Sequence, residues 1–479
     1  METETFYRTG DCWIDLGTVA LWENLISLGG KLRKKRDFLE LKQGKGHTRL
    51  YPHKLVLSGE QGVIEEKLEK VSELVKKKLR GEDGWNGTTK FFFKQYNFNP
   101  DLAFRTPTRM EGMSSIRKGS CDYCGRQETK IRAAGTSENP LIVTKNKMSS
   151  FYPYLRRGSM MCLNCTFVSR LAHLRTLFRF RGSILNMFVI EANNLKDLAD
   201  LIRGKFGQCY IQGEEYRNFN NVIPRTEGVS EEFLGFLLNL WNKLGRSDIL
   251  SESFYKEFPS KFHIIQAERV SQRTVLLKKH LLFSNIQNIL RIFQLMEKTT
   301  KTHRKYNVLQ PVLKNMYYQR LGDIDTIIRE EFSRKIIRGE EVYPVIEKFL
   351  YKSALVESQT LKSWMSYNLN SFITIYEKEV IGMDEGTIKS CRSVGRSLGS
   401  LASEKEKGIL YTLRSTRNLD DFLGSLHQIL TRYMDETSIY RKAMDNVLSE
   451  IDERNWKRYR ALIGIYAVLS YMRERSKRR

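Results

Sequence analysis

The spacing of apolar positions changes along the chain. The first run of apolar residues at helical spacing consists of Leu16, Val19, Trp22, Leu25 and Ile26. It predicts a helix that begins at Asp15 and ends at Gly29–Gly30. A charged amphipathic helix is predicted over 63–79, and the aromatic run over 90–98 favours a strand, because β-formers occupy most of its positions.

Further along, residues 183–191 predict a second strand and 195–202 predict a helix. From about residue 230 helical spacing dominates, in 231–244, in 281–297 and in most of the chain after 340. We therefore expect an antiparallel helical bundle over 341–479.

Two features refine this bundle. Asn418 stands where an N-cap is expected, with Asp421 three residues later near the positive end of the next helix. The apolar run over 461–472 spans 12 residues between Arg460 and Arg473, whereas a membrane span needs about 20. We expect a buried core helix there.

Four of the seven cysteines form two Cys-x-x-Cys pairs, Cys121/Cys124 and Cys162/Cys165, which are separated by 37 residues. Each pair can place two thiolates on one side of a turn, and four sulfur ligands suit tetrahedral Zn²⁺. Four protein ligands leave no open position for an activated water, so the expected zinc is structural.

Three other interpretations of these cysteines stay open. A redox dithiol usually has one such pair near a βαβ pattern, and an iron–sulfur cluster more often has a third close cysteine. The four residues could also be unligated core cysteines. The remaining Cys12, Cys209 and Cys391 are expected to be ordinary buried residues.

Composition indicates a folded protein, and the pattern of predicted elements indicates its class. With 479 residues, 41% hydrophobic and 11% aromatic, the chain is folded and long enough for about three domains. We predict an α+β protein with a mixed N-terminal region over 1–120 and a zinc-knuckle module over 121–182. A mixed to helical middle region over 183–340 and the bundle over 341–479 follow.

Charge points to a polyanionic partner. The 80 Lys and Arg residues exceed the 55 Asp and Glu residues, which leaves a net charge of +25.

The N-terminal sequence carries two early acids and no basic start before an apolar run, so no secretory signal is expected. We expect a cytoplasmic protein with no membrane partner.

One basic window contains no acidic residue between Glu138 and Glu191. Its cations are Lys145, Lys147, Arg156, Arg157, Arg170, Arg175, Arg179 and Arg181, and its interleaved rings are Phe151, Tyr152, Tyr154, Phe178 and Phe180. Cations with stackable rings favour a nucleic-acid surface, although the rings could instead be core and the charges solubilising.

Catalytic motifs are scarce. The chain has no GxxxxGK[ST] loop and no HExxH. A single G-x-S-x-G match at 395–399 is typical of a nucleophile elbow, but it lacks a preceding strand, and its small residues suit close helix packing. We expect no enzyme.

Several of these features occur together in one family. Thr9-Gly10, the Asp15-Leu16-Gly17 run, the two distant Cys-x-x-Cys pairs, Arg396-Ser-Leu-Gly399 and Asn418-Leu-Asp-Asp-Phe422-Leu stand in this order. In this respect the chain resembles the CXXC-CXXC family of CRISPR-associated large subunits of type I Cascade complexes, with I-B or I-A as the nearest subtypes.

The resemblance implies a non-catalytic DNA-binding large subunit that contributes to antiviral defence. Such subunits recognise the protospacer-adjacent motif on duplex DNA, help to open the duplex and stabilise the R-loop. The implied partners are target double-stranded DNA, guide RNA through the complex, the other Cascade subunits and a helicase-nuclease. Guide pairing would supply most of the sequence specificity.

The residues expected to contact DNA are chosen on physical grounds. Cations in the basic run over 31–36 and in the acid-free window would contact phosphates, and two asparagines in or directly after the aromatic run over 90–98 could contact base edges. These residues are Lys34, Lys35, Arg36, Arg156, Arg157, Asn97 and Asn99.

Two alternatives from other classes remain. One is a free-standing zinc-containing nucleic-acid-binding protein. The other is an enzyme, either a hydrolase at Ser397 or a zinc nuclease, and the nuclease would need an open metal coordination position.

Overall fold

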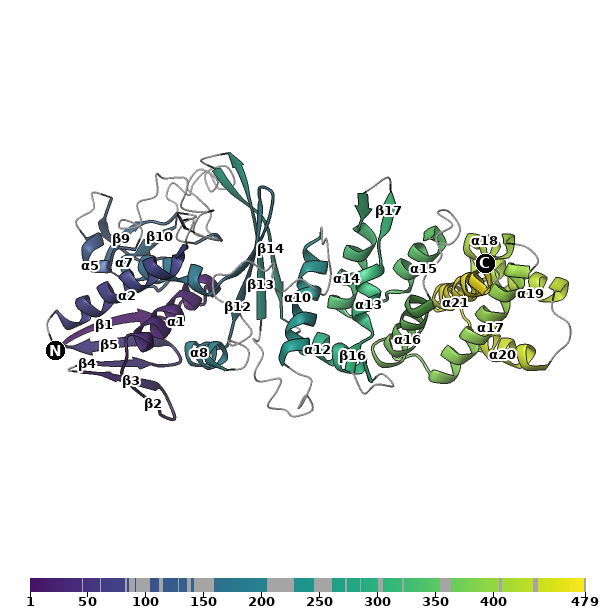
Figure 1. Ribbon diagram of the computed structural model, residues 1–479, viewed down its shortest axis with the longest axis horizontal. Helices are drawn as coiled ribbons and strands as arrows, with labels where there is room; N and C mark the ends of the chain where they lie inside the picture. The colour runs from purple at the N-terminus through teal and green to yellow at the C-terminus, as the bar shows by residue number, and fades with distance from the viewer. Residues whose placement is uncertain are drawn as a thin grey trace. The chain divides into compact units, whose positions relative to one another are not determined.

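The computed structural model describes most of the chain in segments. These are residues 1–44, 46–60, 62–81, 84–85, 91, 104–111, 115–127, 129–135, 139–141, 159–204, 228–244, 261–271, 274–284, 286–299, 305–320, 323–353, 363–404, 407–433 and 438–477. The chain divides into two compact units that interleave along the sequence (Figure 1). Unit 1 comprises Met1–Phe219 and Lys243–Ile286, and unit 2 comprises Asn220–Asn242 and Gln287–Arg479.

Unit 1 contains most of the strands. Its elements are β1 (Glu2–Tyr7), α1 (Cys12–Ser27), β2 (Lys31–Lys34), β3 (Leu39–Gln43), β4 (Gly46–Leu50), β5 (Lys54–Gly59), α2 (Val63–Leu79), β6 (Arg80–Gly81), β7 (Gly84–Trp85), α5 (Pro107–Met110), β8 (Arg117–Gly119), β9 (Thr129–Ala133), β10 (Met160–Cys162), α7 (Leu163–Leu171), η2 (Ala172–Arg175), β11 (Leu177–Arg181), β12 (Ile184–Glu191), α8 (Leu195–Arg203), β13 (Lys261–Ser271) and β14 (Thr274–Phe283).

The first sheet is antiparallel with strand order β1-β5-β4-β3-β2. Buried and more exposed residues alternate along β4 and β5, because one face of the sheet is buried. The buried side chains of β3, β4 and β5 are Leu39, Leu41, Leu50, Leu55 and Leu57. The opposite face carries most polar members of the same strands, as the period of two requires, whereas Thr48 is buried on the leucine face.

Helix α1 differs from the prediction at its start. It begins at Cys12, and its N-cap is Asp11, whose Oδ1 accepts hydrogen bonds from Trp13 N and Ile14 N at 3.0 Å each. Asp15, the expected start, lies in the first turn. The predicted end is confirmed, because Gly29 with φ of +94° follows the C-cap. Helix α2 over Val63–Leu79 agrees with the prediction.

A four-stranded antiparallel sheet of order β11-β12-β13-β14 completes unit 1. Strand β12 and helix α8 confirm the prediction for 183–202. The helix expected over 281–297 is wrong at its start. Residues 281–283 end strand β14, and helix α12 (Ile286–Leu295) begins only after it. Leu282 lies four positions before Ile286 and seven before Ile289, so it extends the helical period of α12 backward. No Gly or Pro stands between Phe283 and Ile286 to mark the boundary.

Unit 2 is mainly helical. Besides α12 its elements are α10 (Val229–Leu244), β15 (Glu297–Thr299), β16 (Lys305–Asn307), α13 (Leu309–Asn315), β17 (Tyr318–Arg320), β18 (Asp323–Asp325), α14 (Ile327–Arg338), α15 (Tyr343–Tyr351), α16 (Ser363–Glu379), α17 (Glu385–Glu404), α18 (Gly408–Ser415), α19 (Leu419–Tyr433), α20 (Ser438–Leu448) and α21 (Trp456–Lys477). The predicted α+β class with a C-terminal helical region is confirmed.

The antiparallel arrangement expected for this region is wrong for its central pair, α17 and α21. A Cβ added to Gly395 would lie 2.6 Å from Ile463 O, and one added to Gly399 would lie 2.1 Å from Ala467 O. The contacts advance in the same direction along both helices, so the pair runs parallel. Helices α18, α19 and α20 lie between them in the chain and allow α21 to begin beside the start of α17.

Helix α21 is the expected core helix, and its residues over 461–469 are buried. Asn418 caps α19 as predicted, because its Oδ1 accepts a hydrogen bond from Asp421 N at 2.7 Å. In the described part of the chain, no helix has both the length and the apolar character that a membrane span needs. The strand predicted over 90–98 lies outside the described residues apart from Phe91.

Candidate metal centre and basic sheet face

The four predicted metal ligands come from two segments of unit 1. Cys121 and Cys124 occupy a turn between β8 and β9, and Gly125 ends this turn with φ of +69°, a conformation that glycine adopts without strain. Cys162 ends β10 and is the N-cap of α7, and Cys165 lies in the first turn of that helix. The antiparallel pairing of β10 with β9 brings the two segments together.

The four sulfur atoms lie within 4.8 Å of one another, so the cluster could hold a metal ion. Cys124 Sγ and Cys162 Sγ are 3.7 Å apart. Cys162 N donates to Cys121 Sγ at 3.2 Å, and Cys165 N donates to Cys162 Sγ at 3.4 Å. Cys121, Cys162 and Cys165 are buried, and Cys124 is half-buried. Amide donors and a helix N-terminus directed at sulfur both favour thiolates.

The electrostatics of the cluster also favour a cation. Hydrogen bonds with Cys124, Cys162 and Cys165 lower the pKa of Cys121, so one thiolate is stabilised by its neighbours. Contacts with Cys121 and then Cys124 raise the pKa of Cys162 and of Cys165. Further ionisation is therefore opposed unless a positive ion compensates the added charge.

The cluster is fastened to the edge strand of the first sheet. Arg126 donates to Thr5 O at 2.7 Å, and Asn164 Nδ2 donates to the same carbonyl oxygen at 3.1 Å. The Arg126 guanidinium lies 5.4 Å from the Tyr7 ring centroid. Arg126 stands two residues after Cys124 and Asn164 directly precedes Cys165, so the geometry of the cluster determines how β1 is held.

The cluster is also tied to α1. Trp13 Nε1 donates to Ser169 O of α7 at 2.8 Å, and a Cβ on Gly17 would lie 1.9 Å from Val168 O. Asp15 accepts hydrogen bonds from Thr9 N at 2.8 Å and from Gly10 N at 3.1 Å. Burial raises the pKa of Asp15 to about 6 despite these bonds. The Thr9-Gly10 and Asp15-Leu16-Gly17 runs therefore shape the packing of α1 on α7.

The exposed face of the first sheet is strongly basic. Strand register places alternate residues of β2 to β5 on it, and we call this surface the basic face. Its basic side chains are Lys31, Arg33, Lys42, His47, Arg49 and Lys54. Within the described strands the face carries one carboxylate, Glu40, and the hydrogen bond from Arg49 Nε at 3.1 Å lowers the pKa of that group. The positive charges therefore predominate.

Aromatic rings lie at one end of the basic face. The Phe38 and Tyr51 ring centroids are 5.1 Å apart, and His53 lies 6.1 Å beyond Tyr51. The Arg49 guanidinium is 5.5 Å from the Phe38 centroid, and Lys54 Nζ is 5.8 Å from that of Tyr51. Sequence reasoning singled out only the run before residue 37. The alternation of Lys42, Arg49 and Lys54 with buried leucines was the signal for the rest of the face.

The residues predicted to contact DNA have different surroundings. Lys34, Lys35 and Arg36 are exposed at the β2 end of the sheet. Lys34 Nζ lies 3.3 Å from Asp200 Oδ2 of α8, and Arg36 O accepts a hydrogen bond from Lys196 Nζ at 2.6 Å. Four further predicted contacts lie outside the described residues, namely Asn97, Asn99, Arg156 and Arg157.

The acid-free window is not a continuous surface. Arg170 and Arg175 are only 5% and 6% exposed, and Phe178 is buried. Arg175 lies 3.9 Å from Glu23 Oε2, so an acid from α1 faces it. Spacing along the chain gave no sign of this partner, which is 152 positions away. Lys145, Lys147, Phe151, Tyr152 and Tyr154 lie outside the described residues.

The remaining residues named from the sequence are three cysteines and Ser397. Cys12 and Cys391 are buried as expected, and Cys209 lies outside the described residues. Ser397 lies inside α17, and its Oγ donates to Ser393 O at 3.0 Å. A nucleophile elbow needs a strand–turn–helix junction, so the 395–399 match is not one. Its glycines serve the close approach of α17 to α21.

The chain matches no protein-family model and none of the curated proteins.

Proposed function

We propose that the cysteine cluster holds a structural Zn²⁺. Four soft thiolate ligands at the corners of a small cluster suit zinc, and their number closes the coordination shell. The ion would keep the turn at Cys121 joined to the start of α7, which in turn holds Arg126 and Asn164 against β1. Metal analysis of the purified chain tests this. One zinc per chain, with four sulfur neighbours in X-ray absorption, is expected, and a nitrogen or oxygen ligand would contradict a closed thiolate site.

We further propose that the chain is a non-catalytic DNA-binding subunit. The basic face carries this proposal, because six basic side chains share one open sheet surface with a single neutralised carboxylate. Cations on such a surface bind phosphates, and the adjoining rings of Phe38 and Tyr51 suit stacking with bases. The net charge of +25 agrees with a polyanionic partner.

The sequence resemblance supports a more specific role, as the large subunit of a type I Cascade complex. In that role the chain would recognise a protospacer-adjacent motif on duplex DNA, assist its opening and stabilise the R-loop. Guide RNA, the other Cascade subunits and a helicase-nuclease would be its partners. The guide would supply most of the specificity, so the isolated chain should bind DNA with little sequence preference and a steep salt dependence.

Removing charges from the basic face tests the DNA-binding proposal. The triple variant Lys31→Gln, Arg33→Gln and Lys42→Gln should weaken duplex binding. It should also reduce the slope of log K against log[salt] by up to about 3, because each lost phosphate contact removes about 0.9. Fluorescence anisotropy at several salt concentrations measures both quantities.

A charge-matched control keeps this test specific. Three lysines of unit 1 that already form ion pairs are replaced by Gln, namely Lys70, Lys130 and Lys278. This control has the same net charge as the basic-face variant, and its affinity for DNA should be close to that of the unmodified chain. Equal losses in both triple variants would reject the basic face as the binding surface.

A further inference from the structure

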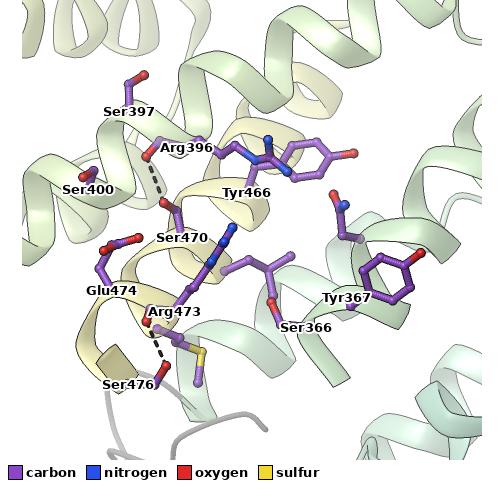
Figure 2. Close-up of a pocket in the computed structure, with 13 residues that line it drawn as sticks. Ser366, Tyr367, Arg396, Ser397, Ser400, Tyr466, Ser470, Arg473, Glu474 and Ser476 are labelled. Atoms are coloured by element: carbon purple, nitrogen blue, oxygen red, sulfur yellow. Dashed lines mark hydrogen bonds between the residues drawn. The ribbon is translucent and has the colours of Figure 1, made fainter. Parts of the chain in front are cut away.

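A polar hollow in unit 2 shares no lining residue with the cysteine cluster or the basic face. It has a volume of about 550 Å³ and is bordered by α16, α17 and α21. Small-molecule sites typically measure about 300–1,000 Å³, so the space suits a ligand of that class. Figure 2 shows Arg396 of α17 and Arg473 of α21 reaching into the same space.

The two guanidiniums form a concentration of positive charge. Neither Arg396 nor Arg473 makes an ion pair with any residue in the described part of the chain. Partial burial, together with the charges of Arg392 and Arg473, lowers the pKa of Arg396. Like charges held this close repel each other, and a bound anion would relieve the repulsion while accepting several guanidinium hydrogen bonds.

One carboxylate also borders the hollow. Glu474 neighbours Arg473 in sequence, but in Figure 2 its side chain lies well to one side of both guanidiniums. The hollow therefore keeps an excess of positive charge where the arginines converge.

The remaining lining adds hydrogen-bonding groups and an aromatic surface. The hydroxyls of Ser366 and Ser400 and the amide of Asn370 have no hydrogen-bond partner among the described side chains and backbone. Tyr367 is 58% exposed, which is unusual for a large ring, and Figure 2 shows it across the hollow from Glu474. Lys298 Nζ lies 5.6 Å from the Tyr367 centroid and adds a further cation at this end.

We propose that this hollow binds a nucleoside phosphate, with Arg396 and Arg473 holding the phosphate and Tyr367 stacking with the base. Paired guanidiniums match phosphate oxygens, and a base needs the aromatic surface that a simple anion would not use. The Ser366, Ser400 and Asn370 groups supply hydrogen bonds to the sugar or base. The ligand could be a free nucleotide or the phosphorylated end of a strand, and both present the same chemistry.

The packing of α17 on α21 explains why a hollow forms here. Gly395 and Gly399 bring the two backbones together, and Ser470 Oγ donates to Arg396 O at 3.0 Å. Backbones this close leave no room between them for long side chains. Arg396 and Arg473 therefore emerge at the margin of the contact, where they border open space.

Calorimetric titration of the full chain tests the proposal with adenosine 5′-monophosphate as the probe and adenosine as the phosphate-free comparison. The monophosphate should bind and adenosine should bind far more weakly. Arg396→Gln and Arg473→Gln should each reduce affinity at least about tenfold, because each removes charge-assisted hydrogen bonds. Arg417→Gln removes an exposed arginine of unit 2 that does not line the hollow and should leave affinity unchanged.

The variant Tyr367→Leu tests stacking with the base without disturbing the fold. The exposed ring can be replaced without opening the core, so the variant should fold normally and bind the monophosphate several-fold more weakly. Retained affinity for the probe in this variant would remove the base-stacking part of the proposal.

A second arm distinguishes the two sources of ligand. An oligodeoxynucleotide with a 5′-phosphate is compared with the same strand carrying a 5′-hydroxyl. A preference for the phosphorylated strand that disappears in Arg396→Gln, without binding of the free monophosphate, would assign the site to strand ends. The proposal would be overturned if the monophosphate does not bind and the phosphorylated strand is not preferred. It would also be overturned if both arginine variants keep the monophosphate affinity or the preference for the phosphorylated strand. DNA binding by the basic face of unit 1 would be unaffected by that failure.

Discussion

The two units achieve stability by different means. In unit 1 a cluster of four sulfur atoms joins segments separated by 37 residues, and α1, α7 and β1 all depend on its geometry. Within the described residues of unit 2 there is no comparable group of metal ligands. Unit 2 relies instead on parallel helix packing and on charged groups enclosed in its core. The stability of unit 1 should therefore respond to chelation, and that of unit 2 to small changes in its core.

The largest effect should follow loss of a metal ligand. Cys165→Ser should release the metal and unfold much of unit 1, because structural zinc can contribute on the order of 10 kcal/mol to folding. Cys12→Ser, at an equally buried cysteine outside the cluster, should keep the metal. Metal content and segment-resolved hydrogen exchange measure the outcome. Faster exchange in α1 and α7 with α17 and α21 unchanged is expected, and equal behaviour of the two variants would contradict this account.

The next largest effect concerns a buried ion pair of unit 2. Arg329 Nε contacts Glu231 Oε2, and their side chains are 1% and 0% exposed. Arg329→Met should cost about 3–5 kcal/mol of unfolding free energy, because it removes the cation that faces the buried Glu231 carboxylate. Denaturant unfolding measures the loss.

The double variant Arg329→Met with Glu231→Gln provides the control for this pair. It removes both charges, so it should recover part of the stability that the single variant loses. No recovery would mean that packing at Arg329, and not the charge of Glu231, determines the cost.

A third effect depends on pH. Glu377 is fully buried, and neither of its carboxylate oxygens has a hydrogen-bond partner in the described structure. Burial raises its pKa from 4.5 to about 7. The contribution of Glu377 to the free energy of unfolding is therefore fully present below about pH 4.5. It is lost as the pH rises through 7, because the folded state must then ionise an enclosed group.

Glu377→Gln should remove this pH dependence. Each pKa unit corresponds to about 1.4 kcal/mol, so the variant should be more stable by up to about 3 kcal/mol at pH 8 and similar at pH 4. Thermal unfolding across this range measures the difference. A variant that is less stable at pH 8 would show that the carboxylate has a compensating partner.

The smallest effect should come from the helix pair. Gly399→Ala should cost about 2 kcal/mol, because the new methyl would meet Ala467 O. Gly424→Ala in α19 has open space around it and should stabilise the chain by about 0.5–1 kcal/mol. Unfolding free energies of the two variants should therefore change in opposite directions. A loss in both would indicate that α19 packs more tightly than described.

The same contrast explains how much could be predicted from the sequence. Helices with local signals were predicted well, as α2, α8 and the capped start of α19 show. The spacing of the cysteines also predicted a cluster that the fold assembles from distant segments. These features depend on patterns within a few residues or on an unusual residue type.

Features that depend on tertiary partners were not predictable in the same way. Strand β13 is buried on both faces over 262–265, so this part shows no alternation that would distinguish it from a helix. Arg175 looks like a surface cation until the fold brings Glu23 to it. The parallel direction of α17 and α21 follows from the path of three intervening helices, which no single segment encodes.

Co-purification tests whether the chain is the large subunit of a Cascade complex. The tagged chain is expressed with the genes that flank its own, and RNA retained after a high-salt wash is sequenced. A Cascade large subunit should be recovered with several other subunits and with uniform, repeat-flanked guide RNAs. A solitary metal-bound protein that retains heterogeneous nucleic acid would contradict the Cascade role and would favour a free-standing nucleic-acid-binding protein.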